Sequence, residues 1–170
     1  MIELRRPSAE LLSSYLDMME EFRANNEKVW EGTVPSETES SRDFLKRLQN
    51  SELHLSQGDV PSSVYWAVIN ERVMGRISIR YELTEYLIEF GGNIGYEVRP
   101  SARGKGFATE MLKLVLETPQ TQKMKQVLLT CSPDNEASIK TILKNKGEFV
   151  RTAFVERMKR QTNYYLIRLS

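Results

Sequence analysis

The sequence contains few of the residues that bind metals or form disulfides. Its 170 residues include one cysteine, Cys131, and one histidine, His54. One cysteine cannot form an internal disulfide, and one cysteine with one histidine cannot supply the ligand set of a zinc site. Carboxylates at metal-binding spacing are missing too. The sequence therefore predicts a metal-free protein of a reducing compartment, the cytoplasm.

Long apolar runs and a large excess of one charge are also missing. No stretch reaches the about 18–20 apolar residues that a membrane-spanning helix needs, and the opening MIELRR lacks the layout of a signal peptide. The formal net charge is +1, far from the basic excess of nucleic-acid-binding domains. There is no RNP-like sequence and no interleaving of aromatic and basic residues. We expect no membrane and no nucleic-acid partner.

The composition is that of an ordinary globular protein, with 40% hydrophobic and 28% charged residues. Its length suits one domain with a substantial core, and no repeat or linker divides it, so we expect a single domain over residues 1–170. The charge is uneven: residues 1–85 hold 10 basic and 15 acidic side chains, and residues 86–170 hold 14 and 8. The basic second half suits a polyanionic ligand.

Apolar periodicity predicts alternating strands and helices. Helical spacing indicates helices over residues 9–24, 38–50 and 106–117, another that opens near residue 135, and a helical turn within 82–90. Alternation with period two indicates strands over residues 2–6, 63–69, 72–81, 93–98, 125–131, 148–158 and 163–169. A strand–helix–strand succession is a right-handed crossover, which predicts that strands 93–98 and 125–131 are parallel.

The most informative stretch is residues 94–111, IGYEVRPSARGKGFATEM. It reads as a strand, a stop at Pro100, and a helix whose apolar period starts at Ala108. The basic turn R-G-K-G-F lies between strand and helix. Its glycines let the backbone approach a ligand, and the helix N-terminus offers unpaired amides and the positive end of a dipole. The arrangement predicts a cradle for an anion such as phosphate.

Two common phosphate motifs do not fit this stretch. A P-loop requires glycine where Arg99 stands and a hydroxyl residue where Gly106 stands. A dinucleotide-binding fingerprint requires glycine or alanine where Thr109 stands. The residues alone therefore leave a simple glycine-rich connector as the alternative to a phosphate cradle.

The stretch resembles the acyl-CoA-binding motif of the GNAT superfamily of N-acetyltransferases, Q/R-x-x-G-x-G/A. Residues 101–106, S-A-R-G-K-G, match both glycines and have serine in first place. The resemblance implies the GNAT fold of the mixed α/β (α+β) class: a mostly antiparallel sheet of about seven strands, flanked by about four helices, with a central β-α-β crossover. It also implies that acetyl-CoA, the acyl donor, binds through Arg103, Gly104, Lys105, Gly106, Phe107 and Ala108.

A weaker resemblance covers residues 131–147, CSPDNEASIKTILKNKG. By this match Asn135 would contact the pantetheine arm, and Ser138 would lie near the phosphates or ribose of CoA. From the residues alone, Asn135 is as well explained as a helix cap. The helix that follows is expected to bury Ile139, Ile142 and Leu143.

The resemblance also suggests how the chemistry would be divided. The Val98 backbone would polarise the acetyl carbonyl, and Glu97 is the candidate base, acting directly or through a water. The alternative for Glu97 is a solvated carboxylate, or one paired with Arg99 or Arg103.

The superfamily's usual general acid is a tyrosine, and Ile142 stands at its position. If catalysis is retained, the thiolate must take its proton from Tyr96, Tyr164 or Tyr165, or from water. Tyr164 and Tyr165 are neighbours on one strand, so only one of them is expected to point into a cleft.

The sequence thus predicts an acetyl-CoA-dependent N-acetyltransferase acting on a small-molecule or peptide amine, and leaves open whether it forms a homodimer. The alternative is a non-catalytic acyl-CoA-binding sensor, which Ile142 favours. Acceptor specificity is expected in the loops 25–38 and 51–62 and in the last hairpin. Trp30, in the first loop, is expected to pack onto the core, with a role in a binding wall as the alternative.

Overall fold

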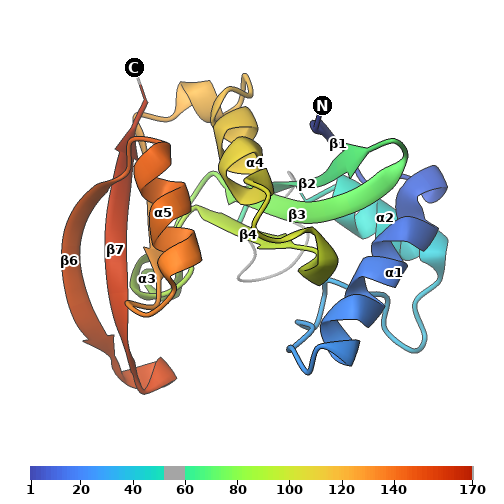
Figure 1. Cartoon of the computed structure of the whole chain (residues 1–170), viewed down its shortest axis with the longest axis horizontal. Helices are drawn as coiled ribbons and strands as arrows, with labels where there is room; N and C mark the ends of the chain where they lie inside the picture. Colours follow the sequence, from blue (N-terminus) through green and yellow to red (C-terminus); the bar gives the residue numbers. More distant parts are fainter. Residues whose placement is uncertain (52–59, 170) are drawn as a thin grey trace.

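A computed structural model describes residues 1–51 and 60–169, and this part contains seven strands and five α-helices (Figure 1). The predicted loop 51–62, with His54, falls largely outside the described residues. The strands are β1 (Glu3–Arg5), β2 (Ser62–Ile69), β3 (Arg72–Arg80), β4 (Ile94–Val98), β5 (Gln126–Cys131), β6 (Glu148–Val155) and β7 (Arg160–Arg168). The helices are α1 (Ala9–Ala24), α2 (Ser41–Gln49), α3 (Glu85–Glu89), α4 (Phe107–Leu116) and α5 (Glu136–Lys144).

The mixed α/β class and the order of elements predicted from the sequence are confirmed. The predicted helical turn within residues 82–90 is the short helix α3, capped by the Thr84 hydroxyl, which accepts a hydrogen bond from the Leu87 amide. Helix α2 is capped in the same way by Ser40. The expectation that Leu143 is buried is wrong: its side chain is 52% exposed, because Thr141 and Ile142 occupy the buried face of α5.

The strands form two antiparallel sheets (Figure 1). One has the order β1-β2-β3-β4, and the other has the order β5-β7-β6. The β2–β3 hairpin turns at Asn70 and Glu71, which both have positive φ, 48° and 58°. Two positive φ values match the right-handed twist of the flanking strands. The register between β3 and β4 then places Arg76 opposite Glu97 and Ser78 opposite Gly95.

Strands β4 and β5 meet at one point and then diverge. The Asn93 amide donates to the Leu128 carbonyl, and the Leu128 amide donates to the Asn93 side chain, both at 2.7 Å. A Cβ at Gly92 would lie 2.3 Å from the Leu128 oxygen, so only glycine allows this approach. Beyond this contact β4 and β5 form no ladder, and they belong to separate sheets. The Asn93 side chain accepts the hydrogen bond of the Leu128 amide, which in a continuing ladder would go to a main-chain carbonyl of β4.

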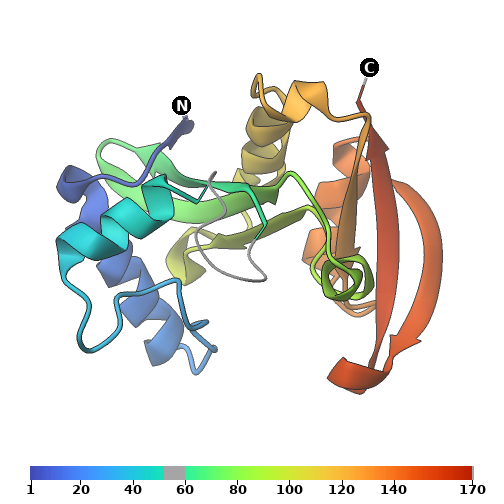
Figure 2. The ribbon, with the colours of Figure 1, turned by 180° about the vertical axis from the view of Figure 1, so that it is seen from behind.

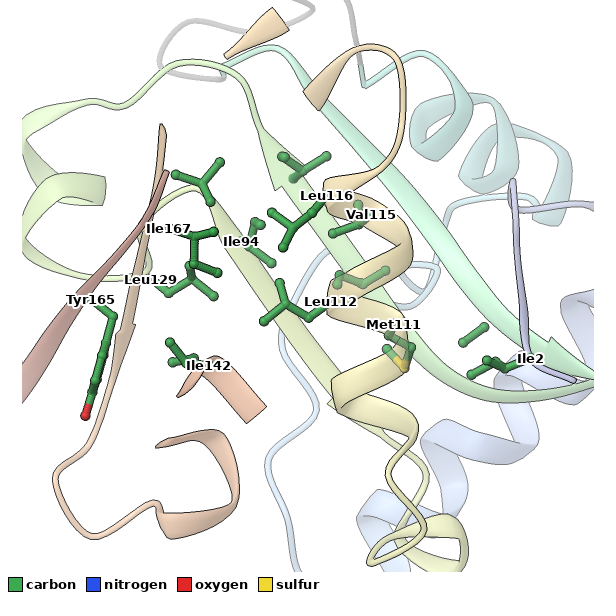
Figure 3. Packing of buried hydrophobic residues seen from close by; sticks show 14 residues of the cluster. Ile2, Ile94, Met111, Leu112, Val115, Leu116, Leu129, Ile142, Tyr165 and Ile167 are labelled. Carbon is green, nitrogen blue, oxygen red and sulfur yellow. The ribbon is translucent and has the colours of Figure 1, made fainter. Parts of the chain in front are cut away.

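Helices cover both faces of the four-stranded sheet. Helix α4 packs on one face, and Figure 3 shows Leu112 and Leu116 pointing toward Ile94, Leu129 and Ile167. These side chains belong to a core that joins the two sheets, and each contributes about 1.5–3 kcal/mol by burial. Figure 2 shows helices α1 and α2 on the opposite face. They pack there through a second cluster around a stacked tyrosine and tryptophan.

Candidate functional site

A cleft of about 1630 Å³ opens where β4 parts from β5. On one side it is lined by the glycine-rich turn, the start of α4 and the start of α5. On the other side it is lined by β3, α3 and the loop of residues 27–33. Strand β4 runs between these two halves, which we call the cradle side and the acceptor side. The candidate base and all the donor-binding residues named from the sequence except Lys105 line this cleft.

The glycine-rich turn has the conformation that the cradle requires. Gly104 and Gly106 have φ values of 75° and 81°, which residues with a Cβ rarely adopt. A Cβ at either glycine would meet nothing within 4 Å, so the space above the turn is open to a ligand. Gly106 caps α4, and the first bond back into the helix comes from the Glu110 amide. The amides before it, from Phe107 onward, have no intrahelical partner and are available to an anion.

Two side chains next to the glycine-rich turn, Arg103 and Ser101, hold it to helix α1 and to the loop after α1. The Arg103 guanidinium donates two bonds of 2.7 Å to the Glu27 carboxylate, and this pairing lowers the pKa of Glu27. The Ser101 hydroxyl donates to Glu21 at 2.8 Å. Serine at the motif's first position thus has a structural use in this chain. The Arg103 side chain is committed to Glu27, so its contribution to a ligand would come from its main chain.

The open edge of β4 presents main-chain groups to the cleft. The Arg99 amide donates to Met74 of β3, and β4 residues face β3 alternately. The main-chain groups of Tyr96 and Val98 therefore point away from β3, into the gap. The Val98 carbonyl accepts a bond of 3.2 Å from Arg103 Nε, which leaves its amide as the group available to a ligand.

Glu97 points to the acceptor side of the cleft. It is paired in register with Arg76, and its Oε1 lies 3.4 Å from Arg76 Nη1. The side chain is 22% exposed, so water can reach it. The alternative in which Glu97 pairs with Arg99 or Arg103 does not hold, because those guanidinium groups bind Glu21 and Glu27.

Tyr96 points to the cradle side and meets α5. Its hydroxyl lies 2.7 Å from the Ser138 hydroxyl, and burial raises the pKa of Tyr96 to about 12. Burial also raises the pKa of the nearby Cys131 thiol. Asn135 is the N-cap of α5, with its side-chain oxygen accepting from the Ser138 amide at 3.1 Å. Asn135 thus serves as the helix cap, and it also lines the cleft.

The position of the usual acid is closed to solvent, since Ile142 is 1% exposed and packs in the core. Tyr164 donates to the Glu89 carbonyl at 2.7 Å, and Tyr165 is 3% exposed within the same core (Figure 3). Neither phenol lines the cleft, so neither alternative proton donor of this pair lies at the site. Of the three tyrosines, Tyr96 alone lines it.

The acceptor side contains residues that the sequence reasoning missed. Arg76, Ser78 and Arg80 lie on the face of β3 that looks into this half of the cleft. The available signal was the stretch R-I-S-I-R, in which charged residues alternate with isoleucines that proved fully buried. Trp30 stands at the rim, 49% exposed, with Lys28 Nζ 4.1 Å from its ring centre. The expected packing of Trp30 onto the core is therefore wrong.

Within residues 1–51 and 60–169, no group of three potential ligands among His, Cys, Asp and Glu could hold a metal ion. The helices of that part are all too short or too polar to cross a bilayer.

Comparisons with known proteins agree with this geometry. A sequence model of the acetyltransferase (GNAT) domain matches residues 2–148. A search of curated protein sequences gives no match. Among solved structures, similar folds include a Salmonella typhimurium acetyltransferase that modifies the N-terminal serine of a ribosomal subunit protein. It has 16% identity and a TM-score of 0.69, and the likeness covers 99% of this chain and 95% of that one.

Two further solved structures contain the donor or its product. RimL, a ribosomal-protein α-N-acetyltransferase in complex with coenzyme A, has 16% identity and a TM-score of 0.65, over 99% of this chain and 94% of that one. The self-immunity acetyltransferase MccE, in complex with acetyl-CoA and AMP, has 16% identity and a TM-score of 0.63, over 98% and 92%. At such identities these likenesses show the fold, and the domain match shows the family. The chain belongs to the GNAT family of acetyltransferases.

Proposed function

We propose that this protein binds acetyl-CoA in the cradle and transfers the acetyl group to an amine held on the acceptor side of β4. The observation that carries the proposal is the open turn at Gly104 and Gly106, directly before the unpaired amides of α4 and beside the free edge of β4. Acetyl-CoA supplies a thioester carbonyl that a neutral amine can attack directly.

The residues divide into groups that bind the donor and groups that move protons. Main-chain groups of the turn and α4, from Arg103 to Ala108 and including Lys105, would hold the pyrophosphate. Asn135 Nδ2 would contact the pantetheine arm of the donor, and the Ser138 hydroxyl would lie near its phosphates or ribose. The Val98 amide would donate to the oxygen that becomes negative in the transition state.

Glu97 would take the proton of the attacking amine. A lysine-like amine has a pKa of about 10.4 and is mostly protonated at neutral pH, so a base on the acceptor side is useful. The orientation of Glu97 into that half of the cleft supports this role. Because the Glu97 carboxylate is partly exposed, a water would also be able to carry the proton from the amine to it.

Tyr96 would stabilise the leaving thiolate through a hydrogen bond, without giving up its proton. A thiol has a pKa of about 8.5, whereas the pKa of Tyr96 is about 12. Complete transfer from phenol to thiolate would therefore be uphill by more than 4 kcal/mol, at about 1.36 kcal/mol per pKa unit. Water is then the final proton source.

A second candidate, an acyl-CoA-binding module without catalysis, is favoured by one observation: the usual position of the acid holds the buried Ile142. The release of free CoA thiol, measured with acetyl-CoA and a panel of primary amines, separates the two. The proposal predicts turnover with at least one amine and a fall in kcat of about 10²-fold or more in Glu97→Gln. Binding of acetyl-CoA without turnover on any amine would favour the module.

A further inference from the structure

We propose that the acceptor carries an anionic group, a carboxylate or a phosphate, that binds between Arg80 and Arg76 on the acceptor side of the cleft. The inference rests on the proposed acetyltransferase function and names the class of amine. Four features of the structure carry it: the position of Arg80, its lack of an acidic partner, an unbonded nitrogen on Arg76, and the absence of a side chain at Gly95.

Arg80 is a half-buried cation without an acidic partner in the described part of the chain. Within the described residues, the Arg80 guanidinium donates a hydrogen bond of 3.3 Å from Nη1 to the Gly92 carbonyl oxygen. Burial, together with the neighbouring Arg76, lowers the pKa of Arg80 from its usual value. A guanidinium nevertheless stays protonated in a protein, so the positive charge remains in the cleft. A charge removed from water is costly unless a partner compensates it.

Arg76 adds a second, incompletely satisfied cation. Its side chain is 16% exposed, and its Nη1 lies 3.4 Å from Glu97 Oε1. Its Nε is buried and has no hydrogen-bond partner. One carboxylate therefore faces two guanidinium groups in this part of the cleft, and the local charge is positive.

Two other arginines that line the cleft, Arg47 and Arg103, are paired with carboxylates. Arg47 donates two bonds of 2.8 Å to Glu39, and Arg103 donates two bonds of 2.7 Å to Glu27. These are the two-pronged contacts that a guanidinium prefers. Arg80 has the same capacity, and no carboxylate of the described residues uses it.

The shape of the site leaves room for a ligand beside these cations. Gly95 faces Ser78 across the strands, and a Cβ at Gly95 would lie 3.9 Å from Arg80 Nη1. Gly95 lines the cleft and has no side chain, so β4 places no side chain of its own next to Arg80 at this position. Gly95 is two residues from Glu97, about 7 Å along the strand. An anion at Arg80 would therefore place the rest of the acceptor within reach of the candidate base.

The anion expected here is not a phosphate of CoA. Arg76 and Arg80 alternate along β3 with Ile77 and Ile79, which pack into the core together with α4. The arginines consequently lie on the opposite face of the sheet from α4, whose first turn forms the cradle. Donor and acceptor would each bring an anionic group, but to different faces of the sheet.

The test compares matched acceptors that differ in charge. Each ω-amino carboxylate of two to six carbons is assayed against its primary amide, and phosphoethanolamine is assayed against ethanolamine, by release of CoA thiol. The wild-type protein should have at least a 10-fold higher kcat/KM for the best amino carboxylate or amino phosphate than for the matched amine that lacks the anionic group. The two series distinguish a carboxylate acceptor from a phosphate acceptor. Equal rates, or a preference for uncharged or cationic amines, would overturn the proposal.

Variants locate the preference. Arg80→Gln should reduce the anion-to-neutral ratio of kcat/KM by about 10- to 100-fold, the range for losing a hydrogen bond to a charged group. Arg80→Lys keeps the positive charge but loses the two parallel N–H donors of the guanidinium, so its ratio should lie between those of Arg80→Gln and the wild-type protein. Arg72→Gln is the matched control on the same strand, because Arg72 lies outside the cleft and its ratio should stay at the wild-type value. A ratio unchanged in Arg80→Gln would contradict the assignment.

A binding measurement separates this inference from the proposed function. Calorimetry with succinate and with inorganic phosphate, in the presence of saturating CoA, measures the affinity of the proposed site for an anion without any turnover. Arg80→Gln should weaken the binding of the preferred anion by at least 10-fold, while Arg72→Gln should not. Absence of turnover with anion binding intact would contradict only the transferase proposal. Absence of anion binding in the wild-type protein, together with equal rates for the paired amines, would reject the site.

Discussion

The two sides of β4 are built in different ways. On the cradle side the proposed binding groups are amides, presented by two glycines with positive φ and by the first turn of α4. On the acceptor side they are side chains, from β3, β4 and the loop that carries Trp30. A backbone site tolerates many side chains but few backbone conformations, whereas a side-chain site depends on the identity of each residue. The two halves should therefore respond differently to mutation.

The largest expected effect is on the cradle side. Gly106→Val should weaken CoA binding by about 100-fold or more, because a branched residue disfavours a φ of 81° and its side chain would fill the phosphate space. Titration calorimetry with CoA measures the loss, and thermal melting shows how much of it reflects lower stability.

Gly32→Val is the matched control on the acceptor side. Gly32 has a similar φ, 83°, and lines the other half of the cleft. The strain should lower its melting temperature comparably, but CoA affinity should stay close to that of the wild-type protein. Equal losses of CoA affinity in the two variants would show that strain, and not the cradle, explains the effect.

A smaller effect is expected at Tyr96, which faces the cradle side. Tyr96→Phe should lower kcat by about 10- to 100-fold, the value of one hydrogen bond to a charged group, with CoA affinity changed little. A raised pKa favours the neutral phenol, so with a pKa of about 12 the wild-type group stays protonated as pH rises from 6 to 10. Ionisation of Tyr96 should therefore not appear in the pH–rate profile over that range.

Tyr164→Phe is the control for this prediction. It removes the bond to the Glu89 carbonyl, outside the cleft, and should lower the melting temperature while leaving kcat near the wild-type value. If Tyr96→Phe also kept the wild-type kcat, water would serve the thiolate without help from Tyr96.

The smallest effect is expected for the charge on the cradle turn. Lys105 is exposed and does not line the cleft. Lys105→Ala should raise the Kd for CoA by less than about 5-fold, because a solvated point charge contributes about 1 kcal/mol or less. Repeating the titration at higher salt should shrink the difference further, since salt screens exposed charges. A larger loss would mean that the lysine side chain contacts the donor directly.

The same contrast explains what the sequence could predict. The cradle follows local rules, so the glycines at 104 and 106 and the period of α4 were sufficient to place it. The acceptor side brings together residues far apart in the chain, such as Trp30, Arg76, Arg80 and Glu97, which the sheet register aligns. Sequence reasoning found Glu97 through the motif on its strand, but it had no rule for the β3 arginines. The point where β4 leaves β5 depended on the Asn93 side chain, which no periodicity reveals.

The most direct test of the account is a calorimetric titration of the wild-type protein with CoA. The account predicts saturable heat with one site per chain, accompanied by a rise in melting temperature that increases with CoA concentration. The heat should be strongly reduced in Gly106→Val and nearly unchanged in Gly32→Val. No heat and no thermal stabilisation at millimolar CoA would contradict the assignment of the cradle, and with it the proposed acetyl transfer.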